Sequence, residues 1–261
     1  MPTIRSASLW LALFALGAPA SPARAGAPLE TETARFPRRG AFEVEAALEV
    51  QRSGDGRESA LPLAFEYGLS DRLTLMAEPV PFTRIHPQSA PGATGIGDLE
   101  VTLSGLLFQE THSHPAFALA GEVKVPTAES MLIGSDQYDY AGYLIASRRF
   151  GRLDAHANLG YTIVGHPAGV AVENTFNYAI AGEYALGPRW TLVGEFLGNT
   201  AAVSGEGPSN EATATPEISG GEQIGMIGAR YRLARRFVAS LGVTVDSAGA
   251  VLLRPGIGAK F

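Results

Sequence analysis

The feature that most constrains the fold is an alternation of apolar and polar residues with a period of two, which is clearest in residues 251–261. One side of this segment carries Leu253, Pro255, Ile257, Ala259 and Phe261. The other side carries Arg254, Gly256, Gly258 and Lys260. A period of two predicts a strand with one apolar face, because successive side chains of a strand point to opposite faces. A final strand that ends on an aromatic residue is typical of transmembrane β-barrels.

The same alternation recurs along the chain. Near its start, for example, Phe42, Val44 and Ala46 alternate with Glu43 and Glu45. The alternation predicts about twelve strands, over residues 41–51, 58–68, 73–82, 96–108, 116–125, 137–150, 153–163, 176–186, 190–199, 227–233, 237–245 and 251–261. The segment 73–82 fits least well because it contains Pro79 and Pro81, and proline cannot donate a hydrogen bond to its neighbour. We expect a bulge or a frayed strand end there.

The connections between these segments differ on the two sides of the predicted sheet. Those after even-numbered strands, such as 70–71, 151–152 and 187–188, are short, whereas several after odd-numbered strands, including 83–95, 126–136 and the excursion at about 200–221, are long. Short turns at one end and long loops at the other are typical of an outer-membrane barrel. The sequence therefore predicts an all-β fold, a transmembrane antiparallel up-and-down β-barrel of about 12 strands. A secreted soluble β-sandwich is the alternative, but it does not account for the asymmetry of the loops.

The N-terminus indicates an exported protein. Arg5 precedes an apolar run at 9–16, which is followed by the small-residue site Ala23-Arg24-Ala25. This order predicts a cleaved signal peptide, since the run is far shorter than the roughly 20 apolar residues of a spanning helix. We expect a signal peptide at 1–25, a periplasmic lead-in at 26–40 and the barrel at 41–261, with both termini in the periplasm.

Composition excludes several classes of function. The chain has no cysteine, which rules out disulfides and thiolate sites, and its net charge of −6 comes without basic clusters, which argues against nucleic acid as a partner. His112 and His114 have a spacing that could hold a metal, but histidines in a turn are more often solvated. We expect neither a metal nor a cofactor.

Two motifs resemble a known family. Residues 95–108, which begin Gly-Ile-Gly-Asp, and residues 115–127, which end Lys-Val-Pro-Thr, are similar to paired strands of the outer-membrane transporters named for the MetA pathway of phenol degradation. The turn Tyr-Gly-Leu-Ser-Asp-Arg-Leu at 67–73 is also typical of them. The resemblance extends loosely over 41–261. It implies a barrel that passes small molecules, which could be aromatic or apolar.

Charged and polar residues on the predicted inner face are the candidates for function. They comprise Glu43, Glu45, Glu66, Asp98, Glu100, Glu122, Lys124, Asp139, Tyr143, Arg149, His156, Glu183, Glu195, Arg230, Arg232 and Arg254. Two interpretations stay open: an acidic wall facing a basic one that orients solutes, or lumen ion pairs that avoid unpaired buried charge.

Other possible functions are a sealed structural or surface-exposed barrel and, less consistent with the sequence, a lipase using His156, Asn158 and a serine such as Ser147. The lipase lacks a nucleophile elbow, and His156 is phased inward. The sequence leaves open whether the loop near Gly205 folds into the lumen.

Aromatic residues next to the predicted short turns suggest how the barrel lies in the membrane. The candidates for a girdle at the lipid interface are Tyr67, Tyr184, Trp190, Tyr231, Phe237 and Phe261. The expected partners are outer-membrane lipid and the barrel-assembly machinery, which would recognise the C-terminal strand. No enzymatic activity is expected.

Overall fold

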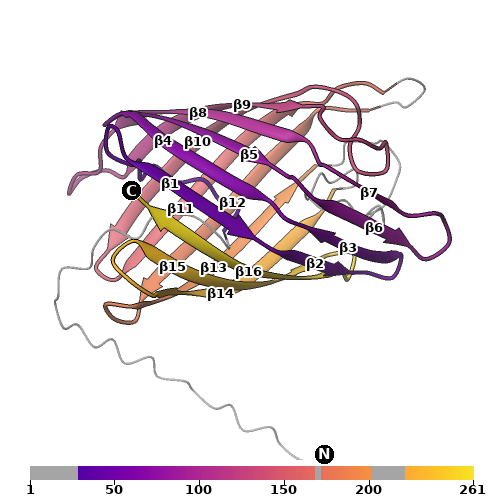
Figure 1. Ribbon diagram of the computed structural model, residues 1–261. Coiled ribbons are helices and arrows are strands. Elements are labelled where there is room, and N and C mark those ends of the chain that lie inside the picture. The colour runs from indigo at the N-terminus through magenta and orange to yellow at the C-terminus, as the bar shows by residue number, and fades with distance from the viewer. Residues whose placement is uncertain (1–28, 168–171, 201–220) are drawn as a thin grey trace, which may run out of the picture.

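The structure is a computed structural model that describes residues 29–167, 172–200 and 221–261. These residues form β-strands joined by turns and loops (Figure 1). The strands are β1 Phe42–Ala47, β2 Glu49–Arg52, β3 Gly56–Ala60, β4 Leu63–Ser70, β5 Leu73–Pro79, β6 Thr83–Pro87, β7 Ala93–Gly95, β8 Leu99–Phe108, β9 Ala116–Val125, β10 Asp139–Phe150, β11 Leu153–Ile163, β12 Thr175–Ala185, β13 Trp190–Asn199, β14 Gln223–Arg232, β15 Phe237–Asp246 and β16 Val251–Lys260. The predicted signal peptide and the region around Gly205 lie outside the described residues.

The strands close into an antiparallel barrel. From β8 to β16 each strand pairs with the next, and before them β1 pairs with β4, β4 with β5 and β5 with β8. The last strand, β16, pairs with β1, with Glu43 opposite Lys260. The closure also includes Phe261, whose backbone exchanges hydrogen bonds with that of Phe42. The predicted 12-strand barrel is therefore confirmed.

Four of the twelve strands are interrupted near the end of the barrel that lies away from the C-terminus (Figure 1). β1 and β2 are successive parts of one strand, as both pair with β16, and the pairs β3/β4, β5/β6 and β7/β8 are divided in the same way. The break between β5 and β6 falls at 80–82, after Pro79, so the interruption expected at Pro79 and Pro81 is present. The interval 83–95, expected to be a long loop, is mostly the hairpin β6–β7. The strands of this hairpin are short and flanked by prolines, so they are too short to show a clear alternation of apolar and polar residues.

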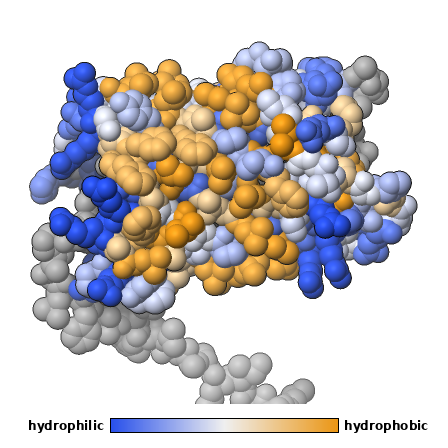
Figure 2. Space-filling model, viewed as in Figure 1, coloured by the Kyte–Doolittle hydropathy of each residue, from blue (hydrophilic) through white to orange (hydrophobic). Residues whose placement is uncertain are grey.

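Outward-facing side chains form an apolar band around the barrel. On β15, for example, Leu241, Val243 and Val245 are exposed, and Ile227 on β14 is 73% exposed. Figure 2 shows this band on one face of the barrel, with hydrophilic residues at both ends. Such a surface is covered by lipid in an outer-membrane barrel. Among the described residues there is no helix that is long and apolar enough to cross a membrane.

The two ends of the barrel differ as expected. Connections at the end that holds Phe261 are short, at 71–72, 151–152, 186–189 and 233–236, with 109–115 somewhat longer. The loop 126–138 and the residues 164–167 and 172–174 lie at the other end. Five of the six predicted girdle residues, Tyr67, Tyr184, Trp190, Phe237 and Phe261, are exposed at the short-turn end. Tyr231, the sixth, is half-buried because its ring packs against Trp190, with 4.6 Å between the ring centroids.

Candidate functional site

The interior of the barrel contains a cavity of about 760 Å³. Met131 and Val164 of the long loops and Pro87 of β6 line it, and so do residues of the N-terminal segment 29–36. Strand side chains from both halves of the chain form its wall. The cavity therefore extends from the long-loop end of the barrel to the N-terminal segment.

Nine of the predicted lumen residues line this cavity. They are Glu43, Glu45, Glu66, Glu100, Glu122, Lys124, Asp139, Tyr143 and Arg254. Their positions on the inner face follow from alternation alone, which sets the direction of a strand side chain. Six other predicted lumen residues form ion pairs or hydrogen bonds elsewhere in the interior: Asp98, Arg149, His156, Glu183, Glu195 and Arg230. Arg232 is exposed, because it is the last residue of β14 and extends beyond the interior.

The wall formed by β1, β4, β5, β8 and β9 is acidic. The strand register places Glu43 opposite Glu66, and Glu78 opposite Glu100. The hydroxyl of Tyr143 donates to Glu122 across a distance of 3.3 Å. Carboxylates therefore predominate on this side of the interior.

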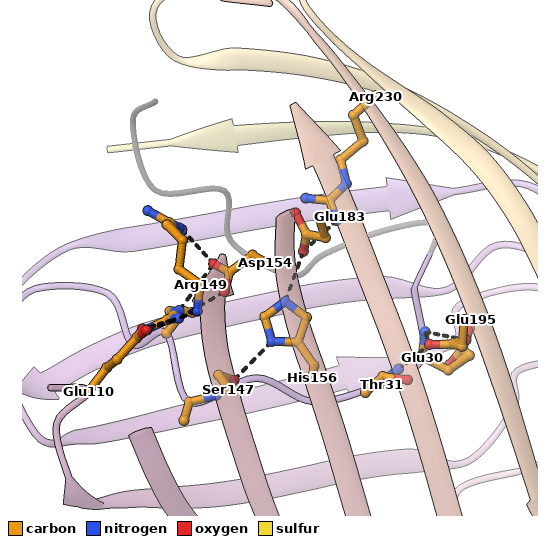
Figure 3. Close-up of polar contacts among 12 residues, drawn as sticks. Glu30, Thr31, Glu110, Ser147, Arg149, Asp154, His156, Glu183, Glu195 and Arg230 are labelled. Carbon is orange, nitrogen blue, oxygen red and sulfur yellow. Dashed lines mark hydrogen bonds and ion pairs between the residues drawn. The ribbon is translucent and has the colours of Figure 1, made fainter. Parts of the chain in front are cut away.

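The N-terminal segment, expected to be a periplasmic lead-in, instead lies inside the barrel from residue 29 to residue 37 (Figure 3). The backbone N–H groups of Glu30 and Thr31 donate to the carboxylate of Glu195 at 2.6 to 3.1 Å. The N–H of Ala34 donates to Ser147 Oγ at 2.9 Å. These contacts satisfy backbone groups that would otherwise be buried without partners.

Small side chains on the barrel wall make room for this segment. Ala34 packs in a buried cluster with Ala116, Ala118 and Ala120 of β9 and with Ile145 of β10. Further along, Leu29 packs with Ala181, Val193 and Met226. Because three successive inward positions of β9 are alanine, the interior beside them is wide enough to hold a second stretch of chain.

An ion-pair network fixes the segment near the short-turn end. The Arg35 guanidinium donates to both oxygens of Asp154, at 3.1 and 2.8 Å, and to Glu110 at 2.5 Å. Arg149 also pairs with Asp154 (Figure 3). Burial raises the pKa of Glu110, but the backbone N–H of Arg149 and the guanidinium of Arg35 outweigh it and hold that pKa below its usual range. Arg149, one of the predicted lumen residues, therefore shares both carboxylate partners of Arg35.

A second polar group joins Ser147, His156 and Glu183. Ser147 Oγ lies 2.8 Å from His156 Nδ1, and a Glu183 oxygen lies 3.7 Å from His156 Nε2 (Figure 3). Glu183 is also paired with Arg230 at 2.9 Å. A hydrolytic triad places the serine on Nε2 and leaves it open to substrate. Here the serine is on Nδ1, is 1% exposed and is covered by Ala34, so the group supports the N-terminal segment.

A third group of charges fixes the loop 126–138. Lys124 pairs with Asp139 at 2.7 Å, lies 3.8 Å from Asp98 and donates to Ser135 at 3.1 Å. Asp98 in turn accepts from the N–H of Ala128. These contacts hold the loop against the cavity, where Met131, Leu132 and Ile133 become part of its lining.

The interior residues that were not among the predicted candidates include Glu32, Arg35 and Glu78. Glu78 is in phase with the neighbouring inward positions of its strand, so its alternation could have identified it, but the following prolines made that strand uncertain. Glu32 and Arg35 belong to a non-repetitive segment whose partners are far away in the sequence, and no local pattern identifies them.

Comparisons with solved structures identify similar barrels. The COG4313 outer membrane channel from Pseudomonas putida F1 superposes with a TM-score of 0.69 and 11% identity, covering 89% of this chain and 100% of that chain. The NanC porin gives a TM-score of 0.60 and 8% identity, with 84% and 100% covered. The KdgM porin in complex with disordered oligogalacturonate gives 0.54 and 12%, with 84% and 99% covered. At these identities the similarity shows the fold, that of outer-membrane barrels.

Among curated proteins, no sequence matches this chain. A family profile does match it, over residues 27–222, which is more than half of the chain and includes the N-terminal segment inside the barrel. That profile carries the description MetA-pathway of phenol degradation, the family that the motifs at 95–108 and 115–127 resemble. The chain therefore belongs to the MetA-pathway of phenol degradation family of outer-membrane β-barrels.

Proposed function

We propose that this protein is an outer-membrane channel for small molecules, in which the N-terminal segment 29–37 is a removable closure. The observation that carries the proposal is the position of the cavity, which begins among the long loops and ends at this segment. A solute that enters from the loop end reaches the middle of the barrel and needs only the displacement of a short stretch of chain to continue.

The contacts of the segment support a closure that can be displaced. It forms no strand pairing with the barrel and is attached mainly by side chains, notably Glu195, Ser147 and Asp154. Its release exposes polar wall groups that water can solvate, so opening leaves few unsatisfied groups. The barrel strands keep their own hydrogen bonds throughout.

The orientation follows from the asymmetry of the ends. We place the short-turn end and the C-terminus in the periplasm and the long loops outside the cell, as in other outer-membrane barrels. The closure then lies on the periplasmic side of the cavity. Exposed aromatic residues such as Trp190 and Phe261 would form the inner interface girdle, and the barrel-assembly machinery would recognise β16. The family description suggests aromatic solutes of the size of phenol, which the cavity can accommodate.

Solute flux is the direct test. Liposomes containing the protein should take up phenol-sized polar solutes faster than protein-free liposomes, and deletion of residues 26–36 should increase the rate and the single-channel conductance. A protein that remains sealed after this deletion would refute the channel and favour a structural barrel. Phospholipid hydrolysis that is lost in Ser147→Ala and His156→Ala would instead favour the lipase, although the buried Ser147 contacts Nδ1 of His156 and not Nε2.

A further inference from the structure

Three arginines lie together on the outer surface of the barrel, at the long-loop end. They are Arg52 of β2, Arg57 of β3 and Arg84 of β6, and all three side chains are exposed. These strands belong to the part of the barrel beyond the breaks that divide the strands, and Figure 2 shows strongly hydrophilic residues over β2 and β3 there. This end of the barrel therefore presents positive charge on the surface that faces away from the cavity.

The strand register brings the three guanidinium groups close together. Arg52 is directly opposite Arg57, and Arg57 is directly opposite His86. His86 accepts a hydrogen bond from Arg84 Nε at 2.7 Å, so it holds the third guanidinium beside the second. Side chains directly opposite across antiparallel strands have Cβ atoms roughly 4.5–5.5 Å apart, and like charges at that spacing destabilise a sheet. An anion bound between the arginines would remove this repulsion.

The carboxylates of the same strands do not compensate this charge. Glu49 and Glu58, on β2 and β3, point to the interior and are 7% and 2% exposed. Asp55, in the turn between these strands, lines the cavity. The three arginines form no ion pair with any carboxylate in the part of the chain that the structure describes. The sheet therefore separates its charges, with carboxylates inside and guanidinium groups outside.

The arginines lie at the edge of the apolar band. Leu48 and Phe82, which directly precede β2 and β6, are 46% and 39% exposed. On the neighbouring strand β16, the exposed Val251 is opposite Arg52. Because a strand rises about 3.3 Å per residue, Arg84 lies only about 7 Å beyond Phe82. The guanidinium groups are therefore at the depth of the lipid headgroups, next to the hydrocarbon region.

We propose that Arg52, Arg57 and Arg84, which we call the arginine patch, bind the phosphate groups of a lipid in the leaflet at the long-loop end. A guanidinium group donates two parallel hydrogen bonds to a phosphate, which makes arginine well suited to this headgroup. The acyl chains of the same lipid pack on the apolar band, beginning at Leu48 and Phe82. If the long loops are outside the cell, as proposed for the channel, this lipid is in the outer leaflet.

A lipid with two phosphate monoesters fits the arginine patch better than one with a single phosphate. Three neighbouring guanidinium groups supply more donors than one phosphate group can use. A second phosphate on the same headgroup engages those that remain. The geometry therefore favours a phosphorylated glycolipid over a zwitterionic phospholipid.

Lipid binding to the full-length mature barrel in detergent tests the proposal. The probes are lipid A with two phosphate groups, its monophosphoryl form and phosphatidylcholine, and native mass spectrometry measures the affinity of each. Diphosphoryl lipid A should bind at least about fivefold more tightly than the monophosphoryl form, because it engages at least one more arginine. Phosphatidylcholine binding as tightly as diphosphoryl lipid A would refute the proposal.

Inorganic phosphate distinguishes a lipid site from a site for free anions. Phosphate alone gains nothing from the apolar band, so an excess of about 100-fold should leave lipid A bound. Displacement of lipid A by this excess would overturn the assignment to a lipid.

Variants locate the site. The double variant Arg52→Gln/Arg57→Gln should weaken binding of diphosphoryl lipid A about 25-fold, and Arg84→Gln about fivefold, because each arginine at a lipid surface contributes about fivefold. Arg235→Gln/Arg236→Gln is the matched control, since it removes two exposed arginines at the short-turn end, and it should leave binding unchanged. A loss in the control as large as that in Arg52→Gln/Arg57→Gln, or no loss in the latter, would overturn the assignment. Heat-modifiable migration on gels checks that each variant folds.

The arginine patch and the channel can fail independently, because the patch lies outside the cavity. Lipid A binding by a barrel that stays sealed when residues 26–36 are removed would refute the proposed function and leave the patch intact. Solute flux through a barrel that does not prefer lipid A would refute the patch and leave the channel intact.

Discussion

Replacement of Arg35 by methionine should open the barrel. Arg35 makes three contacts with Asp154 and Glu110, and methionine fills a similar space without making any of them. Hydrogen bonds to charged groups contribute roughly 1.5–3 kcal/mol each. The barrel carboxylates keep part of their stabilisation after the change, because Arg149 pairs with Asp154 and donates its backbone N–H to Glu110.

Three contacts at the low end of that range contribute about 4.5 kcal/mol, and the contacts of Arg149 retain about 1.5 kcal/mol of this stabilisation. We therefore expect the free energy that favours the closed position of the segment to fall by about 3 kcal/mol. Each 1.4 kcal/mol changes an equilibrium tenfold, so the ratio of open to closed barrels should rise about 100-fold. Single-channel recordings in planar bilayers measure this ratio as the fraction of time spent in the open state.

Arg38→Met is the matched control. Arg38 directly follows the segment 29–37, but it is exposed, and no side-chain contact holds it to the wall. Both variants should fold, as judged by heat-modifiable migration. If Arg35→Met and Arg38→Met show the same open fraction, the closure does not depend on the ion-pair network and the reasoning is refuted.

Three further predictions follow from the interior and from the closing strand. The pKa of Glu32 is about 8 in the closed barrel, against 4.5 when free, so the closed position is most stable below pH 4.5 and loses stability as the pH rises toward 8. The open fraction in single-channel recordings should therefore increase between pH 6 and pH 9. Glu32→Gln should reduce this dependence of the open fraction on pH. Gly160→Ala should cost about 1–3 kcal/mol of unfolding free energy in denaturant titrations, because its Cβ would lie 2.4 Å from the Tyr143 ring, whereas Gly121→Ala meets nothing within 4 Å and serves as control. Deletion of Phe261 should reduce the folded fraction in outer-membrane extracts more than Phe261→Ala does, since only the deletion removes the closing backbone hydrogen bonds, and equal yields would contradict this.

The barrel itself was predictable because its signals are local. Alternation with a period of two fixes which side chains of a strand face inward, and the residues of each predicted strand carry that pattern without reference to any other strand. Glu122 and Tyr143 were placed on the inner face in this way, and the structure has them joined by a hydrogen bond. The breaks at residues 80–82 follow equally from local chemistry, since proline has no N–H.

The position of the N-terminal segment inside the barrel was not predictable from local pattern, because its contacts span most of the chain. Arg35 and Asp154 are 119 positions apart, and Glu30 and Glu195 are 165 positions apart. Residues 29–37 have neither the period of a strand nor that of a helix, so such a segment looks like any polar linker.

The wall nevertheless carried an indication that something packs against it. A water-filled lumen favours polar inward side chains, yet three successive inward positions of β9 are Ala116, Ala118 and Ala120, and Ile145 faces them from β10. An apolar stripe inside a barrel is stable only when other apolar groups cover it, and small residues mark the place where a backbone can approach. The N-terminal segment meets this requirement with Ala34 and Phe36. Inward-facing alanines in such a barrel therefore argue for a chain segment inside the lumen, even where the sequence of that segment has no pattern of its own.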